Sequence, residues 1–138
     1  MKEPLNLTTL DGEEYIIGMF DGLKGRRILL RLLELMKPSQ EMDAKNVATA
    51  LVSGGGEAFI NKADKIVSDL MSVVHAKISE EVGFVAMDDK VFSVHFAGRY
   101  QAMLEVLIEV IEYNGFLDML EYLKQIMPSM PGMTTKKK

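Results

Sequence analysis

The sequence contains no cysteine, no tryptophan and no long uninterrupted apolar run. Without cysteine, the chain forms neither disulfides nor thiolate metal sites. No run approaches the roughly 18 apolar residues that a transmembrane helix requires. Residues 1–12 also lack the apolar core of a signal peptide. We therefore expect a cytoplasmic protein that is neither secreted nor associated with a membrane.

Positive charge is also sparse. The 16 lysines and arginines are outnumbered by 20 acidic residues, and the net charge is −4. Nucleic-acid-binding proteins normally carry a basic face or stripe. Here the basic residues are scattered, apart from the lysines at 136–138. We expect no nucleic-acid partner.

Length and apolar content predict a single folded domain. The chain has 138 residues, of which 48% are apolar, so it can bury a core of its own. We assign residues 1–127 to this globular domain. Residues 128–138 are rich in methionine, proline and lysine without a core pattern, and we expect them to form a disordered tail.

Residue patterns that carry catalysis are missing. His75 and His95 are the only histidines, and neither lies in a metal-binding motif. The glycines at 54–56 precede Glu57 rather than the lysine of a phosphate-binding loop. The acids at 88–89 are adjacent, which suits a solvated turn better than shared acid–base chemistry. We expect a non-enzymatic protein with no cofactor, catalytic site or metal site.

The N-terminal region predicts a β-hairpin over residues 5–18. Asp11-Gly12 is a two-residue turn signal, because glycine adopts positive φ at little cost. Tyr15 and Ile17 alternate with polar neighbours and should share one face. A hairpin alone is only marginally stable in water, so this face should lie on helices.

Three helices are expected to follow. The first covers residues 22–37, begins after Asp21 as N-cap and is stopped by Pro38. Ser39 is the expected N-cap of the second helix, which ends at the glycines before Glu57. The third is predicted over residues 57–77 from its apolar periodicity.

The segment from 83 to 95 leaves two interpretations open. Residues 83–87 are short, apolar and β-prone. Residues 91–95 fit a returning strand, which would complete a second short hairpin near 83–95. They fit the first turn of the next helix equally well.

The strongest apolar pattern lies in the predicted fourth helix, over residues 96–113. Its narrow polar strip implies burial on two sides, or burial on one side and a partner on the other. Asn114-Gly115 should close this helix, and a final helix is predicted over residues 116–127. The predicted fold is therefore α+β and predominantly helical, with about five helices.

Methionine is abundant, with 11 residues. Its flexible side chain suits surfaces that adapt to apolar partners. Met127, Met130 and Met133 recur every three residues among prolines that prevent helix continuation. Two interpretations stay open for them, namely partner contacts or side chains without contacts.

The stretch HFAGRYQAMLEVLIEVIEYNGF, from His95 onward, resembles the C-terminal signature of tail assembly chaperones from long-tailed bacteriophages. In that family an aromatic-x-Gly-Arg step opens an amphipathic helix that ends at asparagine followed closely by an aromatic residue. Phe96, Gly98, Arg99 and Asn114 occupy these positions. The remaining aromatic position is Phe116, and the inserted glycine before it departs from the family pattern.

The surroundings of two residues in this step, Gly98 and Arg99, can be predicted. Gly98 in the first turn of an apolar helix costs about 1 kcal/mol relative to alanine, which close packing of another backbone would offset. Arg99 should either point outward or pair with Asp88 or Asp89.

The resemblance implies a non-enzymatic chaperone, made late in infection in the host cytoplasm, that acts in virion assembly. It would bind the tape measure protein, and the tail tube protein is a second implied partner. The alternative is a structural tail or virion subunit, or a homo-oligomeric interaction protein. The expected partner-binding residues are Phe96, Gly98, Arg99, Tyr100, Val106, Ile108, Met127, Met130 and Met133.

Deleting residues 128–138 should leave the fold intact and weaken capture of the tape measure protein, because Met130 and Met133 are expected contacts. Thermal unfolding followed by circular dichroism and a pull-down would measure the two effects. An unfolded truncated chain would contradict the assignment of a disordered tail. Unchanged capture would show that these methionines are not contacts.

Overall fold

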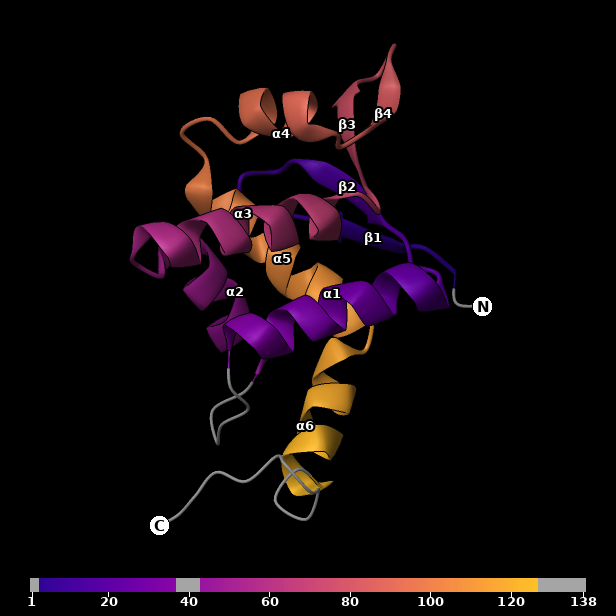
Figure 1. The fold of residues 1–138 in the computed structure, drawn as a ribbon. Helices are drawn as coiled ribbons and strands as arrows, with labels where there is room; N and C mark the ends of the chain where they lie inside the picture. Colours follow the sequence, from indigo (N-terminus) through magenta and orange to yellow (C-terminus); the bar gives the residue numbers. More distant parts are fainter. Residues whose placement is uncertain (1–2, 37–42, 127–138) are drawn as a thin grey trace.

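The computed structural model describes residues 3–36 and 43–126 and confirms an α+β fold in which helices predominate. The four strands form one antiparallel sheet in the order β1-β2-β3-β4 (Figure 1). The strands are β1 (Leu5–Thr8), β2 (Glu14–Ile17), β3 (Val74–Ser79) and β4 (Gly83–Ala86). The helices in the described residues are α1 (Gly22–Leu35), α2 (Ala44–Ser53), α3 (Glu57–Met71), α4 (Asp89–His95), α5 (Tyr100–Tyr113) and α6 (Phe116–Ile126).

The predicted N-terminal hairpin is present, but its connection is wider than expected. Thr8 pairs with Glu14, so residues 9–13 form the loop instead of a two-residue turn at Asp11-Gly12. Thr9 explains the difference, because its hydroxyl donates to the Asp11 carboxylate at 2.5 Å and its N–H donates to the Glu13 carbonyl at 3.0 Å. Side-chain bonds of this kind offer the backbone an alternative to a tight turn.

The first two helices begin at aspartate N-caps. The carboxylate of Asp21 accepts from the Lys24 N–H at 2.8 Å, as predicted for α1. The expected cap of the second helix, Ser39, lies outside the described residues, as does Pro38. Helix α2 starts only at Ala44, and its N-cap is Asp43, which accepts from the backbone N–H three residues on at 2.7 Å.

The third helix is shorter than predicted. It ends at Met71, and the segment expected to extend it to residue 77 forms β3, between β2 and β4. Val74 fits the helical stripe of α3, so periodicity alone did not separate the two states. Buried Val74 and Ala76 alternate with exposed His75, which is the pattern of a half-buried strand.

The open question at residues 91–95 is resolved as helix. These residues belong to α4, which begins after Asp88, whose carboxylate accepts from the Val91 N–H at 2.9 Å. The acids at 88–89 therefore start a helix rather than form a turn. Strand β4 was correctly expected but pairs with β3, so the second hairpin covers residues 74–86.

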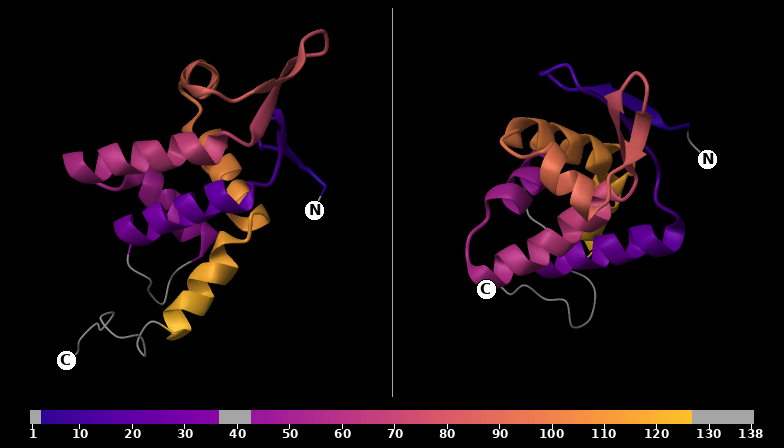
Figure 2. Two further views of the ribbon diagram at one scale, coloured as in Figure 1. Left: turned by 45° about the vertical axis from the view of Figure 1, so that its right-hand side comes forward. Right: turned by 90° about the horizontal axis from the view of Figure 1, so that it is seen from above.

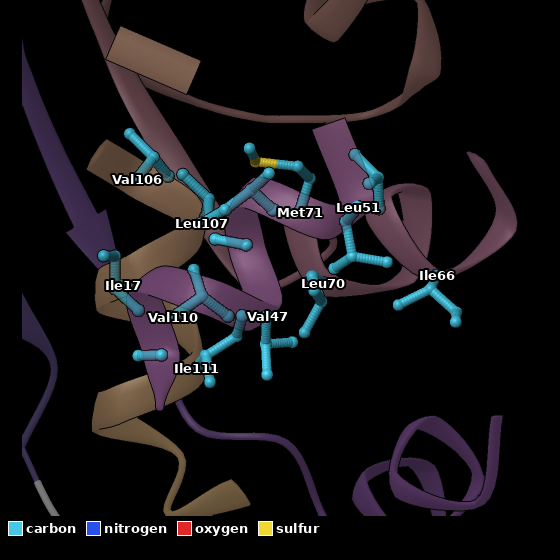
Figure 3. Close-up of a cluster of buried hydrophobic side chains, with 14 of the residues drawn as sticks. Ile17, Val47, Leu51, Ile66, Leu70, Met71, Val106, Leu107, Val110 and Ile111 are labelled. Carbon is cyan, nitrogen blue, oxygen red and sulfur yellow. The ribbon is translucent and has the colours of Figure 1, made fainter. Parts of the chain in front are cut away.

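Helix α5 lies at the centre of the core. It contacts α2, α3, α6 and β2, and Figure 3 shows its side chains meeting those of α2, α3 and β2. Five of its residues are buried: Ala102, Val106, Leu107, Val110 and Ile111. Of the two alternatives for this helix, burial against several elements of the fold is the one that these contacts support.

Helix α6 projects from the rest of the fold (Figures 1 and 2). Phe116 and Leu120 are buried, whereas Met119 and Tyr122 are exposed. The helix is described as far as Ile126, and residues 127–138 lie outside the described part. Among the described residues, no helix has the length and apolar character needed to cross a bilayer.

Candidate functional site

The predicted aromatic-x-Gly-Arg step forms the junction between α4 and α5, because α5 starts at Tyr100 and not at residue 96. Gly98 has φ +73°, a left-handed conformation that glycine adopts at little cost. The expected close packing at Gly98 is wrong, since a Cβ there would have no atom within 4 Å. Glycine is needed here for the backbone conformation that separates the two helices.

Arg99 fastens this junction to the N-terminal hairpin. Its Nε and Nη2 donate to Oδ2 of Asp11 at 3.0 and 2.8 Å, and its Nη1 donates to the His95 carbonyl at 2.8 Å. Arg99 therefore pairs with an acidic residue, which was one of its two expected arrangements, but the acid is Asp11 and not Asp88 or Asp89, because the loop between β1 and β2 reaches Arg99. We call Asp11, Tyr15, His95 and Arg99 the arginine clasp.

His95 accepts hydrogen bonds within the clasp. The Tyr15 hydroxyl lies 2.8 Å from its Nε2, and Arg99 Nη1 lies 3.1 Å from the same atom. Since the guanidinium is a donor only, an unprotonated Nε2 suits both contacts. Burial, and then the charge of Arg99, lower the pKa of His95. The clasp therefore favours neutral histidine.

The other clasp side chains respond to the same environment. Hydrogen bonds from Thr9 and then from Arg99 lower the pKa of Asp11, and burial raises the pKa of Tyr15. Asp11 is thus held as a carboxylate and Tyr15 as a neutral phenol, which matches the charge arrangement around Arg99.

Phe96 belongs to the core under the clasp. Its side chain is 1% exposed. Its ring is nearly parallel to that of Tyr15, with centroids 6.1 Å apart, and meets Phe92 at 5.3 Å. Such aromatic pairs add to the stability gained from burial alone.

Asn114 fastens the opposite end of α5. Its side-chain Nδ2 donates to the Gly18 carbonyl at 3.2 Å and to the Val110 carbonyl at 3.1 Å, while its Oδ1 accepts from the Phe20 N–H at 2.9 Å. Gly115 follows with φ +75°, as expected for a helix end. The sequence indicated the helix end but not the links to the segment between β2 and α1.

The expected partner-binding residues separate into groups. Phe96 and Val106 are buried and unavailable for contact on the folded chain, Ile108 is half-buried, and Arg99 is engaged in the clasp. Gly98 and Tyr100 are exposed, and Tyr100 is 63% exposed. The three tail methionines, Met127, Met130 and Met133, lie outside the described residues.

A second feature, which the sequence interpretation missed, is an apolar groove between α1 and α6. Its volume is about 390 Å³. We call it the α1–α6 groove, and it is lined by Met19, Phe20, Asp21, Gly22, Gly25, Arg26, Leu29, Asn114, Gly115, Phe116 and Met119. On the charged face of α1, Leu23 and Leu30 are also exposed. No local sequence pattern indicated the groove, because its lining comes from segments about 90 positions apart in the chain.

The described residues contain no group of three or more histidine, aspartate or glutamate side chains arranged to hold a metal ion. The polar side-chain groups of the clasp form hydrogen bonds and an ion pair within the protein. The α1–α6 groove offers apolar contact and one guanidinium, that of Arg26. Of the two features, the groove is therefore the one that offers surface to another polypeptide.

Replacing Arg99 with alanine should lower the free energy of unfolding by about 1–3 kcal/mol, because it removes an ion pair and bonds to His95 and Tyr15. In a double-mutant cycle with Asp11→Ala, the coupling should be about 0.5–1 kcal/mol and should shrink with added salt, since both side chains are partly exposed. Urea denaturation would measure both. Arg27→Ala, on the exposed face of α1, is the matched control, and zero coupling would contradict the clasp.

His95 should make the protein sensitive to acid. Because its pKa is lowered in the folded state from the ordinary 6.5, its contribution is complete above that pH and is lost as the pH falls below it. Urea denaturation at about pH 7.5 and about pH 5 should show a smaller loss for His95→Gln than for the wild type. His75→Gln, at an exposed position on β3, should behave as the wild type. Equal losses in all three proteins would contradict a neutral His95.

A comparison with known protein families finds a family model that matches most of the chain. The model of the family described as phage tail assembly chaperone protein, TAC, matches residues 11–121. Searches of curated proteins and of solved structures found no significant match. The matched span starts at Asp11 and includes the whole clasp, Asn114 and the α1–α6 groove. Because it covers most of the chain, the protein belongs to the family of phage tail assembly chaperones.

Proposed function

We propose that this chaperone binds the tape measure protein in the host cytoplasm and keeps it from aggregating until tail tube subunits polymerise around it. A tape measure protein presents long apolar helical stripes. A small, negatively charged partner with accessible apolar side chains would shield these stripes and keep the complex soluble. No chemical step is needed, so we propose a non-enzymatic role.

The observation that carries this proposal is the exposed apolar surface on a chain whose core is already complete. Helix α5 contributes little to it beyond Tyr100, because its other large apolar side chains are buried or half-buried. Exposed apolar side chains occur instead on the two hairpins and on several other helices, α1, α4 and α6 among them. The most exposed are Leu10, Val94, Tyr100, Val82, Leu23 and Tyr122.

Isolated apolar residues on a surface are common and need no explanation. Those near α1 and α6 differ because they border a groove with an apolar floor. Met19 and Met119 at this groove have flexible side chains that adapt to varied apolar partners. A chaperone for a long repetitive client needs this tolerance.

Co-expression with the tape measure protein of the same phage tests the proposal. The chain should raise the soluble fraction of the tape measure protein several-fold and co-purify with it. An unrelated virion protein of the same phage, expressed in the same way, should gain nothing. Equal solubility with and without the chain would contradict tape measure binding.

Finished virions separate this function from a permanent structural role. A chaperone leaves its client before assembly ends, so peptides of this chain should be absent from purified virions by mass spectrometry. Stoichiometric presence in virions would favour the structural-subunit alternative.

A further inference from the structure

The floor of the α1–α6 groove is apolar and comes from three parts of the chain. Phe20 precedes α1, Leu29 lies on α1, and Phe116 starts α6. The rings of Phe20 and Phe116 are 6.0 Å apart and tilted by 39°. Asn114 fixes this geometry, because it accepts from the Phe20 N–H while closing α5. The floor is therefore held by the same link that fastens α5.

The wall formed by α1 is open to a large partner. Gly22 and Gly25 line it, and a Cβ at Gly22 would have no atom within 4 Å. Glycines let another backbone approach closely. Leu23, the neighbour of Gly22 in α1, adds an apolar side chain that is 60% exposed. Because this wall is open at Gly22, the groove can receive the side of a helix.

Positive charge is concentrated in the first half of α1 although the whole chain is acidic, and Arg26 brings part of it to the groove. Lys24, Arg26 and Arg27 lie in the first half of α1, and within the described residues none of them forms an ion pair. By contrast, Arg31 in the second half pairs with Asp69 on α3. Cations in the first turns of a helix oppose its macrodipole. An anionic partner would offset this cost.

The acids around the groove do not supply that partner. Asp21 lines the groove, but one of its oxygens caps α1 by accepting from the Lys24 N–H. Glu34 lies at the far end of α1 and is within 3.9 Å of Lys62. Asp118 is exposed on α6 and forms no ion pair within residues 3–36 and 43–126. The charge at Arg26 thus remains open for a ligand from outside.

We infer that the α1–α6 groove binds an amphipathic helix of the tape measure protein, one whose apolar stripe is flanked by aspartate or glutamate facing Arg26. The inference rests on the proposed function and specifies its site. An apolar floor beside the unpaired Arg26 complements both the apolar stripe and the acidic flank of such a helix. Nucleic acid would satisfy the cations but leave the apolar floor without a partner.

Overlapping peptides of about 22 residues, or six helical turns, that tile the tape measure sequence are the probes. Their affinity for the intact chaperone is measured by fluorescence anisotropy. The bound peptides should be amphipathic and acid-flanked. Replacing their flanking acids with lysine should weaken binding about tenfold or more, and Arg26→Glu should restore the binding of these lysine peptides.

Two matched controls separate the groove from general surface effects. Leu23→Asp combined with Met119→Asp should abolish peptide binding. Val82→Asp should not, although Val82 at 62% and Leu23 at 60% are almost equally exposed. Lys90→Glu on α4 should leave the peptide preference unchanged. Thermal unfolding of each variant confirms that it is folded before affinities are compared.

The remaining outcomes would contradict either the inference, the position of the site or the proposed function. If peptides bind without preference for acids, or if Arg26→Glu and Lys90→Glu act alike, the inference is wrong. If the groove variants still capture the tape measure protein, the site is wrong and the proposed function stands. If the wild type captures neither peptides nor protein, the proposed function itself fails. Binding of a labelled single-stranded oligonucleotide that depends on Arg26 would also overturn the inference.

Discussion

The fold depends on the fastening of α5 at both of its ends to the N-terminal part of the chain. At the start of the helix, Arg99 pairs with Asp11 across 88 positions of sequence. At its end, Asn114 bonds to the backbone of Gly18 and Phe20. These links orient a helix of about 21 Å, whose buried face then meets α2, α3 and β2 (Figure 3). Both links are short-range, since the first is an ion pair with hydrogen bonds and the second is a set of hydrogen bonds to the backbone.

The residues that most resemble the chaperone family have structural roles in the fold, although Phe96, Gly98 and Arg99 were expected to contact a partner. Phe96 fills the core, Gly98 supplies a left-handed backbone, and Arg99 and Asn114 hold the ends of α5. In the folded chain these positions maintain the scaffold. Surface available to a client is displayed elsewhere, on parts that this scaffold positions, such as the floor of the α1–α6 groove beside Asn114.

The proposed role requires a chain that exposes apolar surface without associating with itself. A net charge of −4 on a small body disfavours self-association. Apolar side chains are nevertheless exposed, and those at the groove lie next to cations without ion pairs in the described part of the chain. Because α6 projects from the body (Figure 2), one wall of the groove is more accessible than the packed core helices. In the proposed complex, apolar contact would provide affinity and the charge of Arg26 would select which helices bind.

The sequence by itself determined the fold class, the N-terminal hairpin, the Asp21 cap, the helix end at Asn114 and the family resemblance. Periodicity and capping chemistry are local, so they can be recognised along the chain. Only the tertiary structure decided that the segment after Met71 becomes a strand, that Arg99 pairs with Asp11 and that α1 and α6 enclose a groove. Each of these depends on segments far apart in sequence, and Val74 satisfies a helical stripe and a strand equally until β2 and β4 lie beside it.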